Sequence, residues 1–194
     1  MILQPELTFD EPTHIYRVKD TVVPSVSQVL KAGGGGADYS SVPPEVLKRA
    51  ADIGTAVHKV VEMHYAMNLT MDVDDPSVEA YLPGFYDFVD DNIFEWEWSE
   101  LLMYHPLYWY AGTVDLVGKV EGELSIIDVK TTNKIHKKAV ELQTAAYSEL
   151  YRFVSGQEPY RRYILWLKRH KTYDLVECND PFAFSKFHRM LAAA

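Results

Sequence analysis

The segment YAGTVDLVGKVEGELSIIDVKT, residues 110–131, decides the fold of this chain. Residues 110–120 and 123–131 are rich in β-branched side chains, which favour strands. Between them, Glu121-Gly122 supplies the type of dipeptide that closes a tight turn. The segment therefore predicts two antiparallel strands joined as a hairpin.

The same hairpin holds the densest polar signal of the sequence. Residues two apart on a strand face the same side, so Asp128 and Lys130 project together, whereas Ile127 and Val129 face the other way. Pairing of the two strands brings Asp115 close to Asp128. We therefore expect two carboxylates and one ammonium group in one small area.

Two chemical interpretations fit this group. Carboxylates held close together repel unless a cation joins them, and carboxylate oxygen is a ligand that Mg²⁺ and Mn²⁺ prefer. The alternative is a salt bridge of Lys130 with Asp115 or Asp128, which the Asp-X-Lys triplet alone favours. An aspartate inside the apolar run Ser-Ile-Ile-Asp-Val is nevertheless unusual, because an unpaired buried charge is costly.

The remaining chain supplies the other elements of an α/β (α+β) fold. Hydrophobic periodicity and turn residues predict them in a fixed order. They are a hairpin over 14–23, a helix over 25–31 with Ser25 as N-cap, a glycine-rich loop over 33–36, helices over 44–67 and 77–91, a strand over 94–105, a helix over 137–154, a hairpin of strands 162–168 and 173–178, and a helix over 182–191. This order predicts a central mixed β-sheet flanked by helices.

Composition agrees with a folded protein. The 194 residues are 47% hydrophobic and 24% charged, which predicts one domain over 1–194. Within it, residues 1–43 hold the N-terminal hairpin, short helix and glycine-rich loop, and residues 44–194 form the core. The single cysteine, Cys178, excludes an internal disulfide and a cysteine-based zinc site. No segment has the features of a membrane span or a secretory signal, so we expect a cytoplasmic protein.

Charge is distributed unevenly along the sequence. Residues 62–128 contain 15 acids and one base, whereas residues 130–171 contain 10 bases and three acids. A net charge of −9 therefore does not exclude a local site for a polyanion. We expect a subset of these bases to line a groove for a polyanion that leads to Asp128. Its candidate residues are Lys134, Lys137, Lys138, Arg161, Arg162, Lys168, Arg169 and Lys171.

Two predicted helices carry further polar pairs. His58 and Glu62 lie one turn apart, as do Gln143 and Tyr147. A neutral imidazole can bind a metal ion. In isolation, the first pair is more often a surface contact and the second is more often part of a packing stripe.

The ordered set of these motifs changes that balance. It resembles the PD-(D/E)XK nuclease superfamily, in particular its RecB-like, phage-type exonuclease branch. His14-Ile15-Tyr16 and Pro24-Ser25-Val26 also look like the N-terminal region of phage members. One departure is the absence of a proline before Asp115. The motifs are Gly54-Thr55-Ala56-Val57-His58 with Glu62, Gly112-Thr113-Val114-Asp115, Ile127-Asp128-Val129-Lys130-Thr131, and Gln143-Thr144-Ala145-Ala146-Tyr147.

The resemblance implies a restriction-endonuclease-like core with a Mg²⁺ or Mn²⁺ site. The implied ligands are His58, Asp115, Asp128 and the Val129 carbonyl, with Glu62 as a further candidate and Glu100 as a carboxylate behind the ligands. Lys130 is implied to position or activate the attacking water. Gln143 and Tyr147 are implied to orient Lys130 or the scissile phosphate.

The resemblance further implies a metal-dependent exonuclease that hydrolyses linear DNA in recombination or repair, in a bacterial or phage-infected cell. A separate recombination or single-strand-annealing protein is an expected partner, and the sequence leaves a homo-oligomer open. The alternatives are a structure-specific endonuclease, a non-catalytic DNA-binding or assembly module, and a metal-free hydrolase that uses Asp115 and Asp128. No sequence-reading motif is visible, so we expect a free DNA end to be selected by shape.

Overall fold

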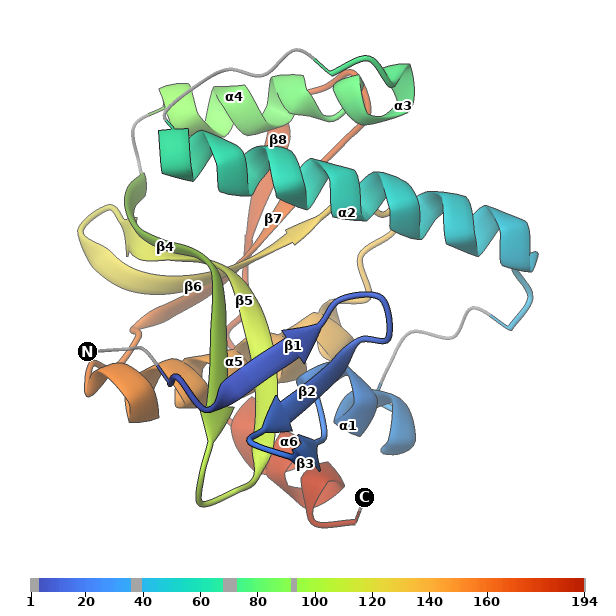
Figure 1. Cartoon of the computed structure of the whole chain (residues 1–194). Coiled ribbons are helices and arrows are strands. Elements are labelled where there is room, and N and C mark those ends of the chain that lie inside the picture. The colour runs from blue at the N-terminus through green and yellow to red at the C-terminus, as the bar shows by residue number, and fades with distance from the viewer. Residues whose placement is uncertain (1–3, 36–39, 68–72, 92–93, 194) are drawn as a thin grey trace.

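The computed structural model describes residues 4–35, 40–67, 73–91 and 94–193. Its helices and strands follow one another along the chain in groups (Figure 1). They are β1 (Leu7–Asp10), β2 (Ile15–Val18), β3 (Thr21–Val23), α1 (Val26–Ala32), α2 (Pro44–Met67), α3 (Pro76–Glu79), α4 (Leu82–Asp90), β4 (Phe94–His105), β5 (Tyr110–Val120), β6 (Glu123–Lys130), α5 (Lys137–Ser155), β7 (Arg161–Leu167), β8 (Tyr173–Glu177) and α6 (Ala183–Leu191).

The central sheet is mixed, as predicted. Its strand order is β4-β5-β6-β7-β8. Strands β4, β5 and β6 pair antiparallel, β6 and β7 pair parallel, and β7 and β8 form an antiparallel hairpin. The parallel pair requires a long connection, and helix α5 provides it. The expectation of an α/β fold with a central mixed sheet between helices is thereby confirmed.

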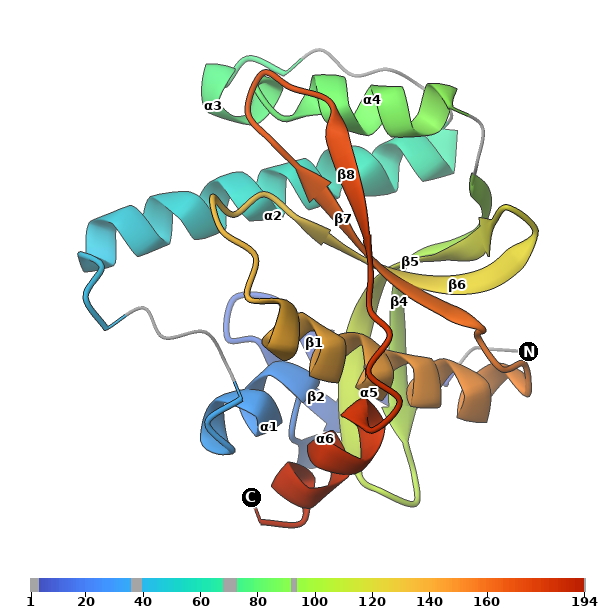
Figure 2. The ribbon, with the colours of Figure 1, turned by 180° about the vertical axis from the view of Figure 1, so that it is seen from behind.

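Helices cover both faces of this sheet (Figures 1 and 2). Helices α2, α3 and α4 pack on one face, where Val57 and Phe85 are fully buried in a cluster with sheet residues. Helices α1, α5 and α6 pack on the other, around the fully buried Tyr151 and Phe187. Two separate apolar clusters therefore hold the sheet between them.

A second, three-stranded sheet has the order β1-β2-β3. The β2–β3 hairpin confirms the one predicted over 14–23, whereas strand β1 was not anticipated. This small sheet packs on β4 and β5 through Leu7, Tyr16, Val23 and Ala111. The predicted N-cap Ser25 is confirmed, because its hydroxyl accepts a hydrogen bond from the Gln28 backbone N–H within a complete capping box.

The helix predicted over 77–91 is wrong in one respect, because the chain forms two helices there. Asp75 caps the short helix α3, and the chain turns at Ala80 and Tyr81 before α4 begins. Pro83 stands in the first turn of α4. A proline lacks the backbone N–H that a helix interior requires, whereas the first turn has no intrahelical partner for it.

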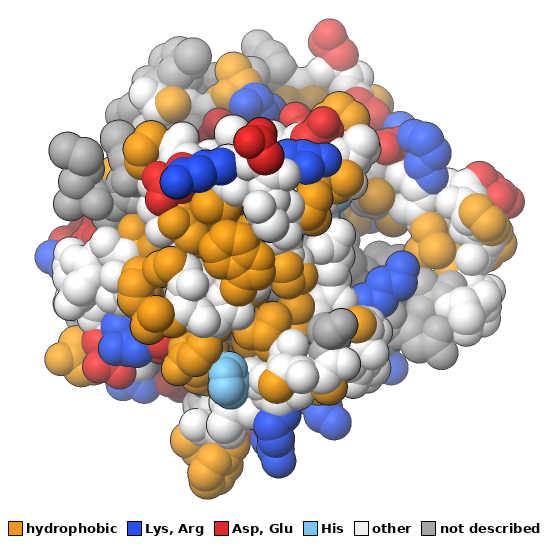
Figure 3. All heavy atoms as spheres, turned by 60° about the horizontal axis from the view of Figure 1, so that its bottom comes forward, with side chains coloured by type: hydrophobic (Ala, Val, Ile, Leu, Met, Phe, Trp, Pro, Cys, Tyr) orange, Lys and Arg blue, Asp and Glu red, His pale blue; other side chains and the backbone are white. Residues whose placement is uncertain are grey.

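Of the predicted loop Gly33–Gly36, Gly36 lies outside the described residues, and Gly33 forms the C-cap of α1. Among the helices of the described residues, none combines the length and the apolar character of a membrane span. Exposed apolar side chains gather on the face that Figure 3 brings forward. Among the described residues, the exposed large hydrophobic side chains include Leu107 of the β4–β5 turn, Phe153 of α5 and Phe182, the N-cap of α6.

Candidate active site

The β5–β6 ladder ends where the candidate acids begin. Its final pair in this direction is Leu116 with Ile127. Beyond this pair, the Val129 N–H donates its hydrogen bond to a side chain instead of a backbone carbonyl. The acceptor is Asp115 Oδ2, at 2.6 Å. Asp115 and Asp128 are buried at this point, with 8% and 0% exposure. The hairpin thus brings two carboxylates into the sheet interior.

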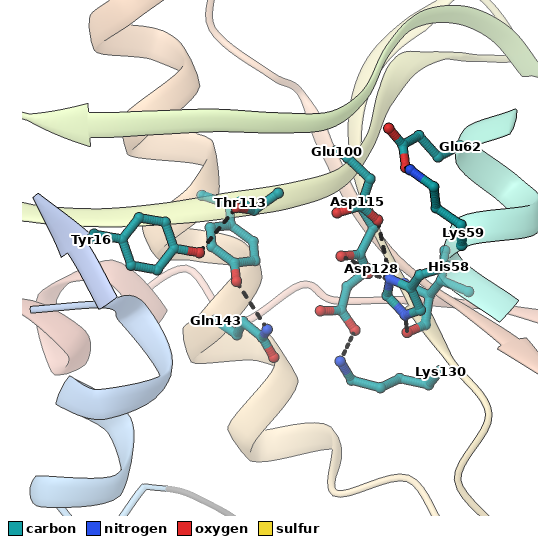
Figure 4. A network of polar contacts seen from close by, with 12 residues as sticks. Tyr16, His58, Lys59, Glu62, Glu100, Thr113, Asp115, Asp128, Lys130 and Gln143 are labelled. Atoms are coloured by element: carbon teal, nitrogen blue, oxygen red, sulfur yellow. Dashed lines mark hydrogen bonds and ion pairs between the residues drawn. The ribbon is translucent and has the colours of Figure 1, made fainter. Parts of the chain in front are cut away.

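Helix α2 brings His58 against this pair of strands (Figure 4). The His58 Nδ1 lies 3.2 Å from Glu100 Oε1 and 3.5 Å from Asp115 Oδ1, and its Nε2 lies 3.2 Å from the Val129 carbonyl oxygen. Burial opposes a charge on the imidazole, but Asp115 and Glu100 outweigh it and raise the pKa of His58 to about 9. Both ring nitrogens then donate hydrogen bonds to these oxygens.

One ligand-type atom from each of His58, Glu100 and Asp115 lies within 4.8 Å of the other two. We call these three residues the metal cluster. Two carboxylates and one imidazole suit a divalent cation. Glu100, which the resemblance places behind the ligands, therefore stands among them in space.

The backbone at Glu100 is unusual. This residue lies within strand β4 but has φ of 49°, in the left-handed region that residues with a Cβ rarely occupy. The paired registers on either side are Ser99 with Leu116 and Leu101 with Val114. Such a conformation costs on the order of 1–3 kcal/mol and is often found at functional sites.

Asp128 and Lys130 form an ion pair beside the cluster, with 2.6 Å between Asp128 Oδ2 and Lys130 Nζ. Within the described part of the chain, neither Asp128 oxygen has a hydrogen-bond partner of regular geometry. Burial raises the pKa of Asp128 to about 6, although the Lys130 charge opposes the shift. A buried carboxylate whose described partner is a single ammonium group is a candidate for a metal ligand or a base.

Helix α5 supplies Gln143 and Tyr147. The Gln143 Nε2 donates a hydrogen bond of 3.1 Å to the Tyr147 hydroxyl. Burial raises the pKa of Tyr147 well above its usual value, so the phenol stays neutral. Gly112 makes this position available, because a Cβ there would lie 2.7 Å from a Tyr147 ring carbon. The glycine of the Gly-X-X-Asp motif thus has a packing reason.

For Glu62 and Tyr16, the structure shows contacts that the sequence motifs do not indicate. Glu62 forms an ion pair of 2.6 Å with Lys59 and is not a member of the metal cluster. Tyr16, which no chemical argument from the sequence singled out, forms a hydrogen bond of 2.9 Å with Thr113 Oγ1 (Figure 4). Tyr16 belongs to the N-terminal motif His14-Ile15-Tyr16. The spacing of that motif in the sequence does not indicate that β2 contacts strand β5.

The predicted DNA-binding bases fall into separate regions. Lys134 is exposed between β6 and α5, and Lys137 and Lys138 are exposed in the first turn of α5. Lys168, which pairs with Asp174, lies with Arg169 and Lys171 between β7 and β8. The first group of lysines follows the C-terminal end of β6 at Lys130. The second group of bases follows the C-terminal end of the neighbouring parallel strand β7, where Trp166 lies opposite Lys130.

Arg161 and Arg162 lie at the opposite end of β7. Arg161 pairs across from Ser125 of β6, five residues before Lys130, which corresponds to about 16 Å along the strand. It forms ion pairs of 2.6 Å with Glu123 and with Glu177. Arg162 donates hydrogen bonds to the carbonyl oxygens of Glu141 and Asp180. Both guanidinium groups therefore have internal partners, remote from the metal cluster.

Comparison with known proteins gives a similarity at the level of structure. No protein-family model matches the chain, and no curated protein sequence matches it. A crystal structure of a provisionally assigned exonuclease from Eubacterium rectale superposes with a TM-score of 0.53 and 13% sequence identity. The match covers 85% of this chain and 69% of the other. At this identity the similarity establishes a shared fold.

Proposed function

We propose that this protein is a divalent-metal-dependent deoxyribonuclease of the PD-(D/E)XK type. The observation that carries the proposal is the meeting of His58, Glu100 and Asp115 from three separate elements, next to the buried pair Asp128 and Lys130. The fold shared with a provisionally assigned exonuclease supports the same reaction class. Mg²⁺ or Mn²⁺ is the proposed cofactor, because carboxylate oxygens dominate the available ligands.

In this proposal the metal cluster, Asp128 and the Val129 carbonyl would hold the cation. A divalent cation at this position would activate a water molecule and neutralise charge on the phosphate. Asp115 is fixed by its hydrogen bond from the Val129 N–H, so its second oxygen keeps a constant direction. Lys130 carries a positive charge where negative charge develops on the phosphoryl oxygens. Gln143 and Tyr147 stand beside this group as hydrogen-bond donors that orient the phosphate.

We further propose linear DNA as the substrate and an exonucleolytic mode of action. Lys134 follows the end of β6, and Lys137 and Lys138 lie in the first turn of α5, so the phosphate backbone would pass over these lysines toward Lys130. The acidic helices α3 and α4 lie beyond α2 in Figures 1 and 2, on the other side of the sheet from α5. A role in recombination or repair belongs to the same proposal.

Digestion of end-labelled linear duplex, linear single strands and covalently closed circles tests this function. We expect rapid loss of linear DNA with Mg²⁺ or Mn²⁺, resistance of closed circles, and complete inhibition by EDTA. Fast cutting of closed circles would overturn the exonuclease assignment, whereas the assignment as a nuclease would stand. Activity that persists in EDTA would overturn the metal-dependent reaction.

A further inference from the structure

Two segments of the N-terminal region, the turn before β2 and the first turn of α1, meet in space. His14 precedes β2, and Ser27 lies in the first turn of α1; both residues are exposed. The His14 Nε2 lies 3.5 Å from Ser27 Oγ, and Ser27 Oγ lies 3.0 Å from Ser25 Oγ. An imidazole and a hydroxyl group therefore stand together at the surface.

Tyr16 connects this pair to the metal cluster. Its ring contacts the His14 ring edge-on at 5.8 Å, and its hydroxyl bonds Thr113, which lies two residues before Asp115 on strand β5. Tyr16 is 3% exposed. Burial raises the pKa of Tyr16, and the charges of Glu100 and Asp115 add to the shift, so its hydroxyl is within electrostatic reach of both carboxylates.

The position of the pair relative to β5 is fixed by main-chain contacts. The Ala111 N–H donates a hydrogen bond of 2.9 Å to the Pro24 carbonyl oxygen, and Ser25 forms an isolated parallel bridge with Ala111. The capping box of Ser25 and Gln28 fixes the first turn of α1. Ser27 is thus held against the strand that carries Asp115, and the segment of His14 is held to the same strand by the hydrogen bond of Tyr16 with Thr113.

The turn that carries His14 also faces helix α2. The ion pair with Glu62 raises the pKa of Lys59, and Glu11 of the β1–β2 turn and Glu100 add to this effect. Figure 1 shows the β1–β2 turn pointing toward α2. The β1–β2 turn therefore approaches the part of α2 that carries His58 and Lys59.

We propose that His14 and Ser27 form a second phosphate subsite, which binds a phosphodiester group of the DNA strand next to the scissile one. The proposal rests on the proposed nuclease function. An imidazole N–H and a hydroxyl O–H both donate to phosphate oxygens, and contacts of this kind position a strand without reading its sequence. The His14 ring also packs against Phe9 and Tyr16. That packing alone would not require the Ser27 hydroxyl group beside His14 Nε2.

Comparison of a large and a small substrate tests the subsite. DNA oligonucleotides span both sites, whereas bis(4-nitrophenyl) phosphate occupies the metal cluster alone. We expect His14→Ala and Ser27→Ala each to raise the KM for DNA by about tenfold, the scale of a hydrogen bond to a charged group, with kcat nearly unchanged. Hydrolysis of the small diester should stay the same.

Thr13→Ala is the matched control, because the Thr13 backbone N–H, not its side chain, bonds Asp10. It should leave both substrates unaffected. An unchanged KM for DNA in both His14→Ala and Ser27→Ala would overturn the subsite. An equal loss with the small diester would also overturn it, since the effect would then lie at the metal cluster.

A neutral methylphosphonate, moved along the oligonucleotide one linkage at a time, locates the subsite. Wild-type protein should lose affinity when the neutral linkage lies next to the scissile one, and His14→Ala should not respond to it. Equal responses of the two proteins would contradict the subsite. Wild-type protein that hydrolyses neither DNA nor the small diester with Mn²⁺ would refute the nuclease function itself, so the two failures are distinguishable.

Discussion

Lys130 is the residue whose role separates a catalytic site from a structural ion pair. Its ammonium group already balances the buried carboxylate of Asp128 at 2.6 Å. If it also stabilises charge on the reacting phosphate, Lys130→Ala should lower kcat by about 100-fold or more. Turnover of linear DNA measures this, and Mn²⁺ binding should persist.

Lys119→Ala is a suitable control for this substitution, because Lys119 makes a surface ion pair of 3.7 Å with Glu95. Such pairs contribute about 0–1 kcal/mol. Near-normal turnover of Lys130→Ala, with the variant folded as judged by its melting transition, would leave Lys130 as a purely structural partner of Asp128.

Asp128 also predicts a pH dependence of stability in the metal-free protein. Its pKa rises from 3.8 to about 6 on folding, so the folded state binds more protons than the unfolded state between these values. The contribution of Asp128 to the free energy of unfolding therefore falls as pH rises through this window, by up to about 1.4 kcal/mol per pH unit.

Urea unfolding in EDTA between pH 4 and 7 checks this sign. Asp128→Asn removes the titrating group, so its free energy of unfolding should fall less with rising pH than that of the wild type. The difference between the two proteins isolates Asp128 from carboxyl groups whose pKa values are lowered, such as Asp75 and Asp180. Identical slopes in the two proteins would contradict the buried, poorly bonded state of this carboxylate.

The residues of the site differ in how well the sequence could predict them. The proximity of Asp128 to Lys130 follows from strand periodicity, and that of Asp115 follows from a local hairpin. Glu100 meets His58 across 42 residues, through packing of α2 on β4 and a left-handed backbone that no sequence pattern indicates. Tyr16 likewise depends on the docking of the small sheet.

At the scale of elements, the surroundings of two motif glycines, Gly112 and Gly54, predict opposite effects of an alanine substitution on stability. A Cβ on Gly112 would lie 2.7 Å from the Tyr147 ring and 3.2 Å from Val26, whereas a Cβ on Gly54 would meet only Thr131 Oγ1, at 3.6 Å. Gly112→Ala should therefore destabilise the protein by about 1–3 kcal/mol and displace Tyr147. Gly54→Ala in helix α2 should be neutral or stabilising by about 0.5–1 kcal/mol.

Urea midpoints and DNA turnover measure both effects. A loss of turnover in Gly112→Ala that exceeds its loss of folded protein would show that the position of Tyr147 matters for the reaction. A fully stable and active Gly112→Ala would contradict the close contact between strand β5 and helix α5.

Most elements were predictable because their signals are local. Helix α2 begins at Pro44 and ends at Met67, as the apolar spacing predicts. The division of the 77–91 segment into α3 and α4 depends on the packing of Val78, Tyr81 and Phe85 against the sheet. The hydrophobic periodicity of the sequence continues across the boundary between α3 and α4. A single long helix was therefore expected over 77–91.

At the scale of the whole molecule, the charge excess of residues 130–171 divides into two parts. Arg161 is satisfied by Glu123 and Glu177, whereas Lys134 and Lys138 are exposed near the end of β6. A sum of charges along the sequence contains no distances, so it could not separate these groups. Lys134→Ala and Lys138→Ala should each reduce the log–log salt slope of duplex binding by about 0.9, the value of one phosphate contact.

Arg161→Gln is the comparison for this measurement and should leave the salt slope unchanged. Fluorescence anisotropy of a labelled duplex between 50 and 200 mM salt, roughly the range over which such contacts act, provides the slopes. A reduced slope in Arg161→Gln, with none in the lysine variants, would move the DNA path to the opposite end of the sheet.

The most direct test of the metal site is a calorimetric titration of Mn²⁺ into wild-type protein, Asp115→Ala, Glu100→Gln and the control Asp52→Asn. Asp52 lies on α2 and pairs with Lys48 at the surface. We predict wild-type binding with release of the His58 proton, seen as a dependence on buffer ionisation heat. Affinity should fall at least about tenfold in Asp115→Ala and Glu100→Gln, and stay constant in Asp52→Asn. Equal affinity in all four proteins, or no binding to the wild type, would contradict the site.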